Sequence, residues 1–545
     1  MQRVTKKENE SLESQRASTK TANKSASRIS RTIKSSKTRK SLPPTSIAPR
    51  LGELWENEAG TSTQALRPRP KEATINLKRC MYKIVEDVAT LMGMGIVRDD
   101  EEPWDVYWSD FSVSTVMSKS MEVYHRINHF PGMANLESKA FLAYHLNRMR
   151  NHFPEDYDFY PRSWSLPYQQ EDFLSYVREH PHQVFISKPS RGAEGKGIKI
   201  FNTLEEARGI YTESVSQLYM SNLLLMDGFK FDLRVYVLIT CIDPLRIFVY
   251  NNGLVRLATC QYTSPETGNL TNQYMHLTNY SVNKSSENYN KSPERGSKRD
   301  FTALNSWLLS QGLNSTKLWN DIDDIIIKTI ISVYPILKEK YEDLLPEHYH
   351  HNVSASFEIL GFDILIDSTM KPFLLEVNRS PSFNIAGIVD ERVKRTLIYD
   401  TFKILNLNQN RKSILFPSND DSENQSSNSQ FGSTNDSNDM NFSTPTRHEY
   451  HKGKITLTSD DTQSYERSKS QPSSNDIKHS KITNSAAGNR QKTVTIKEQI
   501  KWETRHLGNY RLIYPNNESY TYSKFIHYIF TVPEMYTDKK RTQSN

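Results

Sequence analysis

Two hydrophobic periods alternate along the middle of the chain, between residues 71 and 407. Apolar residues recur every three or four positions in segments 321–334 and 389–405, which predicts a helix over each. Strands are predicted where β-branched and aromatic residues dominate, at 183–187, 231–242, 246–250, 357–367 and 372–377. Residues 367–371 separate the last two strands as a hairpin turn would. We therefore expect a mixed α+β fold with much antiparallel sheet.

The segments on either side of this region differ from it in composition. Residues 1–70 are rich in Lys, Arg, Ser and Thr, and 14 of the 27 residues from 418 to 444 are Ser or Asn. Such segments bury too little apolar surface to offset the entropy lost on ordering. We therefore expect a disordered basic tail over 1–70 and a disordered linker over 408–495. Aromatic residues return in 496–545, which we expect to pack on the core.

Charge narrows the class of protein. The first fifty residues hold 13 Lys and Arg against 3 Asp and Glu, and taking this excess of +10 from the net charge of +7 leaves −3 on the other 495 residues. A near-neutral folded region argues against a nucleic-acid-binding core, because the basic surface of such a protein should lie on its folded part.

Apolar runs and cysteines narrow the class further. The chain has no run of 18 apolar residues and no apolar signal core at its N-terminus, so we expect neither membrane insertion nor secretion. Three widely spaced Cys predict neither a disulfide framework nor a zinc cluster, and they fit a reducing cytoplasm.

A lysine- and glycine-rich segment, residues 185–198, is the first candidate site. A strand leads into Lys188, glycines follow at 192, 195 and 197, and a second strand begins at Ile198. Such a loop can hold backbone N–H groups over phosphates while Lys188 and Lys196 neutralise their charge. It is not a Walker loop, since no Gly-Lys-Ser/Thr opens a helix. A plain surface hairpin is the alternative.

Three polar residues on the strands 357–367 and 372–377 form the second candidate. Asp363 interrupts an apolar strand, whereas Glu376 and Asn378, two positions apart, point to one face of the next strand. Burying two carboxylates on paired strands is costly unless a cation neutralises them, and Mg²⁺ takes oxygen ligands of this kind. A structural hydrogen-bonded pair at a solvent-facing edge is the alternative.

Two further segments are less distinctive. Lys230, Asp232 and Arg234 alternate with apolar residues and therefore share one strand face, as either a ligand-binding wall or a solvated edge would. Residues 276–284 carry short polar side chains, which predict a strand or turn but do not by themselves indicate a site.

Taken together, these segments resemble the tubulin tyrosine ligase-like family, which has an ATP-grasp fold. The matching motifs are Lys-Pro at 188–189, Gly-Lys-Gly-Ile at 195–198, Asp-Gly-Phe-Lys-Phe-Asp-Leu-Arg at 227–234, His-Leu-Thr-Asn-Tyr at 276–280, Gly-Phe-Asp at 361–363 and Leu-Glu-Val-Asn at 375–378. Their order and spacing hold across about 75 to 405. Residues 507–515, Leu-Gly-Asn-Tyr-Arg-Leu-Ile-Tyr-Pro, are similar to a segment that follows the catalytic core in the polyglutamylase branch.

The resemblance implies an ATP-dependent carboxylate–amine ligase. Its ATP-grasp core would have an N-terminal domain over 71–180, a central domain over 181–250 and a C-terminal domain over 251–407. In this chemistry ATP phosphorylates a carboxylate of the acceptor protein, and the amine of a free amino acid then attacks the acyl phosphate. The polyglutamylase branch, which the longer motifs resemble most, predicts a tubulin polyglutamylase that adds L-glutamate to glutamate side chains of the tubulin C-terminal tails.

The resemblance also implies roles for individual residues. The nucleotide would contact Lys188, Lys196, Gly197, Ile198, Gln217, Leu218, Tyr219, Met220, Lys230, Phe231, Asp232, Thr278, Asn279 and Glu376, with adenine held at the hinge 217–220. Mg²⁺ would be bound by Asp363, Glu376 and Asn378. Substrates would meet Arg256, Tyr280, Ser281, Lys298 and Arg379. The catalytic residues would be Lys188, Lys230, Arg256 and Glu376. Arg256 and Lys298 suit a free glutamate, whose two carboxylates need charge-assisted donors.

The implied partners are tubulin, microtubules and free L-glutamate, and the implied enzyme is a monomer of the cytoplasm and cytoskeleton, at the cilium, axoneme or basal body. The basic tail would add long-range attraction to the acidic lattice. Two alternatives stay open: the same ligase chemistry with another amino acid or a non-tubulin acceptor, and a non-catalytic microtubule-binding protein. The second requires loss of a metal ligand or a phosphate-binding lysine, and Lys188, Asp363, Glu376 and Asn378 are all present.

Overall fold

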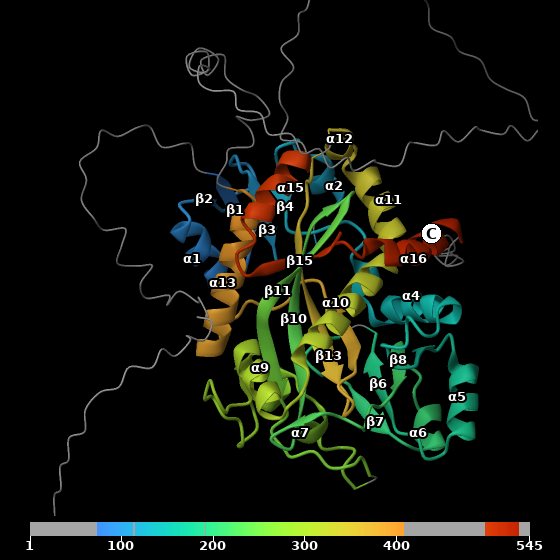
Figure 1. Ribbon diagram of the computed structural model, residues 1–545. Coiled ribbons are helices and arrows are strands. Elements are labelled where there is room, and N and C mark those ends of the chain that lie inside the picture. The colour runs from blue at the N-terminus through green and yellow to red at the C-terminus, as the bar shows by residue number, and fades with distance from the viewer. Residues whose placement is uncertain are drawn as a thin grey trace, which may run out of the picture. The chain divides into compact units, whose positions relative to one another are not determined.

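The computed structural model describes residues 73–112, 115–190, 192–266, 268–351, 353–407 and 496–532. The predicted tail 1–70 and linker 408–495 lie outside the described residues. Within them the strands form three sheets, one of four parallel strands and two that are antiparallel (Figure 1). The expectation of a mixed fold with much antiparallel sheet is therefore confirmed. No helix among the described residues is long and apolar enough to cross a membrane.

The first sheet is parallel, with strand order β2-β1-β3-β4, and the sequence patterns did not predict it. Helix α1 packs beside it because Ile84, Val85 and Val88 recur at helical spacing and join a hydrophobic cluster with strand residues of β1 and β3. The elements of this region are β1 (Thr74–Arg79), α1 (Lys83–Leu91), β2 (Gly95–Val97), β3 (Val106–Ser109), α2 (Thr115–Lys119), β4 (Arg126–Ile127), α3 (Ala134–Glu137) and α4 (Lys139–His152).

The second sheet is antiparallel, with strand order β5-β8-β6-β7. The predicted strand 183–187 is confirmed as β6, and β6 and β7 pair as a hairpin around the glycine-rich loop. Aromatic rings fill the space under the sheet, where Phe173 meets Phe185 edge-on and Phe185 stacks on Phe201. The elements are β5 (Ser163–Leu166), α5 (Gln170–Glu179), β6 (Phe185–Pro189), β7 (Lys199–Phe201), α6 (Leu204–Arg208) and β8 (Ser214–Leu218).

The third sheet has seven strands, and its main path is β12-β11-β10-β13-β14, with β9 paired to β10 and β15 to β11. The predicted strands are confirmed as β10, β11, β13 and β14, the predicted helices as α10 and α13, and the turn 367–371 joins an antiparallel pair. The elements are β9 (Leu225–Met226), β10 (Phe229–Ile242), β11 (Leu245–Leu257), α7 (Gln273–His276), α8 (Tyr280–Asn283), β12 (Lys298–Asp300), α9 (Phe301–Ser310), α10 (Ser315–Ile331), α11 (Tyr334–Leu344), α12 (Pro346–His350), β13 (Glu358–Ile366), β14 (Pro372–Asn378) and α13 (Ile388–Ile404).

One prediction of local structure was wrong. Residues 276–284 were expected to form a strand or turn, but they end α7 and form the whole of α8. The side chain of Asn283 explains the compact shape, because its Nδ2 donates to the carbonyls of Leu277 and Asn279 and ties one turn of chain onto itself.

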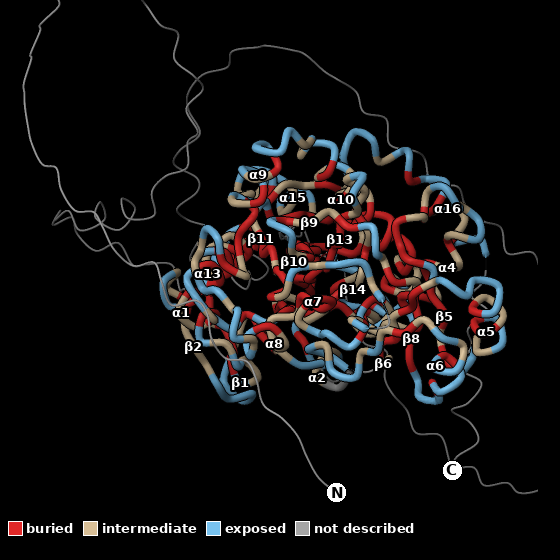
Figure 2. Tube along the Cα trace, turned by 90° about the horizontal axis from the view of Figure 1, so that it is seen from below, coloured by how far each residue is buried: buried red, intermediate tan, exposed pale blue. Residues whose placement is uncertain are grey.

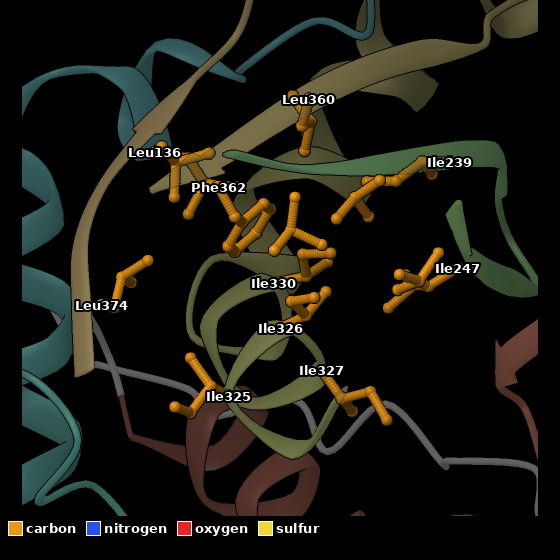
Figure 3. Packing of buried hydrophobic residues seen from close by; sticks show 14 of the residues in the cluster. Leu136, Ile239, Ile247, Ile325, Ile326, Ile327, Ile330, Leu360, Phe362 and Leu374 are labelled. Atoms are coloured by element: carbon orange, nitrogen blue, oxygen red, sulfur yellow. The ribbon is translucent and has the colours of Figure 1, made fainter. Parts of the chain in front are cut away.

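The two faces of β10 have different roles. Leu233, Val235, Val237 and Ile239 alternate along one face and pack on α10, whose isoleucines fill the space under β10, β11 and β13 (Figure 3). These strands are buried along most of their length (Figure 2). The opposite face is apolar at Tyr236 and Leu238, which join the cluster containing α13, but it is polar at residues 230, 232 and 234. A cavity lies over this polar end.

The segment 496–532 packs on the core, as the sequence predicts for residues 496–545. Its elements are α15 (Ile496–Arg505), β15 (Tyr510–Tyr514), η2 (Ser519–Tyr522) and α16 (Ser523–Thr531). Strand β15 pairs with β11, and Phe525 and Ile529 of α16 enter the main hydrophobic cluster. Glu503 of α15 is fully buried and accepts a hydrogen bond of 2.6 Å from Nε of Arg246. The docked segment therefore brings the carboxylate that neutralises a buried arginine of the core.

We predict that Glu503→Ala destabilises the chain by about 3 kcal/mol, because Arg246 is left charged and buried without its partner. The measurement is the urea midpoint of the purified chain. Lys501→Ala, on the exposed side of the same helix, is the control and should change stability by no more than about 0.5 kcal/mol. Equal effects of the two variants would show that the buried ion pair does not hold the segment in place.

Candidate functional site

A cavity of about 500 Å³ is lined by both antiparallel sheets, the glycine-rich loop, α8 and the start of α13. It gathers most of the side chains that the sequence singled out, although they are spread over nearly two hundred residues of chain. Those that line it are Lys188, Lys196, Ile198, Gln217, Leu218, Tyr219, Met220, Lys230, Asp232, Arg256, Thr278, Asn279, Tyr280, Ser281, Lys298, Asp363, Glu376 and Asn378.

Three of the sequence-predicted site residues do not line the cavity. Phe231 alternates with its polar neighbours on β10 and therefore points into the opposite, apolar cluster. Gly197 has a φ of +72°, and a Cβ there would lie 2.9 Å from Pro189 Cγ, so its part is to shape the loop. Arg379 comes directly after β14 and turns away, where it pairs with Glu137 at 3.3 Å and donates to Ser112 Oγ.

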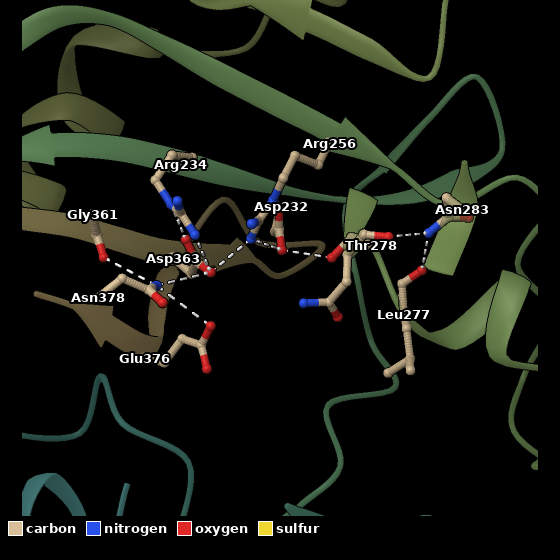
Figure 4. Close-up of polar contacts among 11 residues, drawn as sticks. Asp232, Arg234, Arg256, Leu277, Thr278, Asn283, Gly361, Asp363, Glu376 and Asn378 are labelled. Carbon is tan, nitrogen blue, oxygen red and sulfur yellow. Dashed lines mark hydrogen bonds and ion pairs between the residues drawn. The ribbon is translucent and has the colours of Figure 1, made fainter. Parts of the chain in front are cut away.

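A chain of alternating charges crosses the wall of the cavity (Figure 4). Arg234 donates to both oxygens of Asp363, at 2.6 and 3.1 Å, and Arg256 reaches the same carboxylate at 2.8 Å. Arg256 also donates twice to Asp232, at 2.7 Å each. The sheet register aligns them, because Asp232 faces Arg256 on β11 and Arg234 faces Asp363 on β13. Although burial opposes ionisation, the two guanidiniums hold the pKa of Asp363 well below its usual range.

The carboxylates of Asp363 and Glu376 and the side-chain amide of Asn378 converge at one end of this chain of charges. Asn378 Nδ2 lies 3.5 Å from Asp363 Oδ2 and 3.4 Å from Glu376 Oε1, so the amide sits between both carboxylates. The described residues hold no group of three or more His, Cys, Asp and Glu placed to bind a metal ion. A half-rotation of the Asn378 amide would turn its oxygen, in place of its nitrogen, toward the two carboxylates. Two carboxylates and one amide oxygen are the hard donors that Mg²⁺ takes when water and phosphates complete its coordination shell.

Two buried lysines face the cavity. Burial lowers the pKa of Lys188 to about 8 and that of Lys230 to about 7, and in each case a nearby carboxylate offsets part of the effect. An anion entering the cavity would favour the charged form of both. Lys196 differs, because its side chain is 81% exposed and pairs with Glu194 at 2.7 Å.

The glycine-rich loop is held by two hydrogen bonds near its middle in the described structure. Ser281 Oγ of α8 donates to the carbonyl of Glu194 at 2.8 Å, and Lys139 Nζ of α4 donates to that of Gly192 at 3.1 Å. Ser281, which the sequence assigns to substrate, is therefore engaged with the loop here. Lys139 Nζ also lies 3.5 Å from Glu376 Oε2 and links the loop to the carboxylate cluster.

The cations assigned to the amino-acid donor are paired with carboxylates of the chain itself. Lys298 Nζ lies 2.6 Å from Asp390 Oδ2 and 4.2 Å from the centroid of the Tyr280 ring, while Arg256 belongs to the charge chain. Asp390 also binds Lys394 Nζ at 2.8 Å. A donor carboxylate would have to share these cations with the aspartates.

Several residues that line the cavity were not predicted as site residues, among them Lys139, His276, Asp390 and Lys394, and Arg234 was given no role of its own. Arg234 lay on the polar strand face that the sequence does show. Asp390 and Lys394 are four positions apart at the start of a predicted helix, a spacing that was available as a signal. Lys139 gave no local signal, since it reaches the cavity from outside the two antiparallel sheets.

Comparison with known proteins agrees with this arrangement. A model of the tubulin-tyrosine ligase family matches residues 116–414. The chain is 45% identical over 342 residues to the tubulin polyglutamylase TTLL6 of Homo sapiens, which covers 63% of this chain and 38% of that protein. It is 44% identical over 367 residues to the tubulin polyglutamylase TTLL13 of Homo sapiens, and this match covers 67% of this chain and 44% of that protein. It is 34% identical over 462 residues to the tubulin polyglutamylase TTLL7 of Xenopus tropicalis, and this match covers 83% of this chain and 47% of that protein.

The chain thus spans less than half the length of each of these relatives. The family match, by contrast, takes in more than half of the 545 residues and contains every residue that lines the cavity. The chain belongs to the tubulin-tyrosine ligase family.

Proposed function

We propose that the chain is a tubulin polyglutamylase, an ATP-dependent ligase that joins L-glutamate to glutamate side chains of tubulin C-terminal tails. The observation that carries the proposal is one cavity in which buried lysines face a cluster of carboxylate and amide oxygens, within a chain similar to three named tubulin polyglutamylases. A nucleoside triphosphate with a divalent cation suits such a set of charges, because the phosphates pair with the lysines and the cation pairs with the carboxylates.

In this proposal the core is an ATP-grasp fold with domains over 71–180, 181–250 and 251–407. The adenine would lie at the hinge 217–220, and the triphosphate would run under the glycine-rich loop. Lys188 and Lys230 would meet the phosphates, and Lys196 would join them when it leaves Glu194. Thr278 and Asn279 would complete the pocket.

Asp363, Glu376 and Asn378 would hold Mg²⁺, which when bound neutralises phosphate charge. Asp363 would keep its arginine partners. The chain itself would orient the acceptor carboxylate toward the terminal phosphate of ATP. It would also direct the donor amine toward the carbon atom of that carboxylate. Positioning and charge compensation would do most of the work, because the protein takes no covalent part.

Donor selection would depend on Arg256 and Lys298. Both are buried or nearly so, and a dicarboxylate is the amino acid that can pair with two such cations at once. Glycine or tyrosine offers a single carboxylate, so either Arg256 or Lys298 would keep only its aspartate partner. The enzyme would work as a monomer on microtubules in the cytoskeleton, including those of cilia, axonemes and basal bodies, with tail 1–70 adding attraction to the acidic lattice.

The proposal is tested by mass spectrometry of unmodified microtubules incubated with the chain, ATP, Mg²⁺ and equimolar glutamate, glycine and tyrosine. We expect mass increments of glutamate on tubulin tails, and none with Glu376→Gln, which removes a charged metal ligand. Glu171→Gln, a change of the same kind on the exposed side of α5, is the control and should label as the wild type does.

Increments of glycine or tyrosine would favour the same ligase chemistry with another donor. Absence of any increment, on bare or pre-glutamylated microtubules, would favour a non-tubulin acceptor or a non-catalytic role. Labelling by Glu376→Gln equal to that by the wild type would contradict the metal site.

The pKa of Lys230 predicts how ATP affinity depends on pH. Because burial lowers this pKa to about 7, the free chain loses the Lys230 charge as pH rises through neutrality, and bound phosphate restores it by proton uptake. We expect the Kd for Mg·ATP to rise from pH 6.5 to 8.5 and calorimetry at pH 8 to show proton uptake. Lys230→Arg keeps its charge over this range and should make the profile shallower, leaving the part that comes from Lys188, whose pKa burial lowers to about 8. A wild-type profile as flat as that of the arginine variant would contradict this assignment.

A further inference from the structure

A line of three side chains leads away from the buried ammonium of Lys230. Lys230 Nζ lies 3.2 Å from the hydroxyl oxygen of Tyr219 and 4.6 Å from the centroid of its ring. The same hydroxyl lies 2.7 Å from Nδ1 of His276, whose Nε2 lies 3.1 Å from the carbonyl oxygen of Asn269. Tyr219, Lys230 and His276 are all less than 8% exposed. The line joins the hinge, β10 and α7, three elements far apart in sequence.

The chemistry of the partners fixes where the protons lie. A carbonyl only accepts, so Nε2 of His276 carries a proton and donates to Asn269. Burial, helped by the Lys230 charge, lowers the pKa of His276 to about 4, so the imidazole is neutral at physiological pH and its Nδ1 is a free acceptor. The Tyr219 hydroxyl therefore donates to Nδ1. An ammonium only donates, so the oxygen of that hydroxyl accepts from Lys230.

The direction of the Tyr219 hydroxyl thus depends on His276. With its proton held by Nδ1, the hydroxyl oxygen presents a lone pair to Lys230, and the only proton between the two groups is the one that the ammonium donates. Without that acceptor the hydroxyl can rotate its proton toward Lys230, where it would oppose the ammonium. Tyr262 is a second phenol beside Tyr219 and adds to burial in raising the pKa of Tyr219, and its own hydroxyl donates to the carbonyl of Ser221.

We propose that His276 is a positioning residue for the nucleotide site: by accepting the Tyr219 proton, it turns the Tyr219 oxygen toward Lys230 and fixes the ammonium where the phosphates enter. His276 itself need not contact the nucleotide. The inference rests on the proposed function only in requiring that the cavity bind ATP.

Two substitutions of His276 separate this role from simple packing. In His276→Asn the amide oxygen occupies the place of Nδ1, two bonds from Cβ, and can accept from Tyr219. In His276→Gln the amide reaches the place of Nε2 and keeps the bond to Asn269, but offers nothing at Nδ1. Gln is the closer match to His in volume. A packing role therefore favours Gln over Asn, whereas a positioning role favours Asn over Gln.

The experiment measures the Kd of the full chain for Mg·ATP by calorimetry, with the melting temperature of each variant recorded beside it. We expect His276→Gln and Tyr219→Phe each to weaken binding by about tenfold, the usual effect of losing one hydrogen bond to a charged group. His276→Asn should stay within about threefold of the wild type. The double variant Tyr219→Phe/His276→Gln should bind no more weakly than Tyr219→Phe, because both changes break one line.

A kinetic readout separates positioning from general damage. In the glutamate-transfer assay the KM for ATP should rise in His276→Gln without a matching rise in the KM for L-glutamate. Binding by His276→Gln as tight as that of the wild type, or by His276→Asn as weak as that of His276→Gln, would overturn the inference and leave the proposed function standing. A wild-type chain that does not bind Mg·ATP would overturn both.

Discussion

The four alternating charges Arg234, Asp363, Arg256 and Asp232 hold the site and the sheet together. Two of the three links, Asp232 with Arg256 and Arg234 with Asp363, join residues that face one another on neighbouring strands, and the third reaches from Arg256 on β11 past β10 to Asp363 on β13. The register of β10 with β11 and β13 therefore sets the geometry of the cavity wall. Isolated buried charges are costly, but here each carboxylate has a guanidinium partner and each guanidinium a carboxylate. The charged wall is therefore stable in a buried part of the protein, where the low dielectric constant strengthens its electrostatic field.

The same alternation that builds this wall also builds the core behind it. Odd-numbered residues of β10 pack on α10, and even-numbered residues change from charged to apolar where α13 takes over from the cavity. The burial that results lowers the pKa of Lys188 and Lys230, so a bound anion favours the charged form of both. Packing and the proposed phosphate binding would in this way be two consequences of one strand pattern, and the line of side chains through Tyr219 and His276 would extend that pattern to residues 217–220.

Much of this arrangement could be predicted from the sequence, because strand alternation and motif spacing are local signals. They placed the antiparallel strands, the polar face of β10 and the oxygen cluster of Asp363, Glu376 and Asn378. These local signals could not predict contacts between segments that are far apart in the sequence. The parallel N-terminal sheet has strands of two to six residues, too short for a clear period. The family resemblance places Arg379 at the substrate site, and in the structure its side chain pairs with Glu137 outside the cavity. Lys139 enters the cavity from a helix with no motif of its own.

The most direct test is a crystal structure of the chain with a non-hydrolysable ATP analogue and Mn²⁺, which substitutes for Mg²⁺ and is located by its anomalous signal. The arrangement of charges predicts one anomalous peak at the oxygens of Asp363, Glu376 and Asn378, with the phosphates lying between that peak and the two buried lysines. A nucleotide bound outside this cavity, or a metal ion held by other residues, would contradict the site.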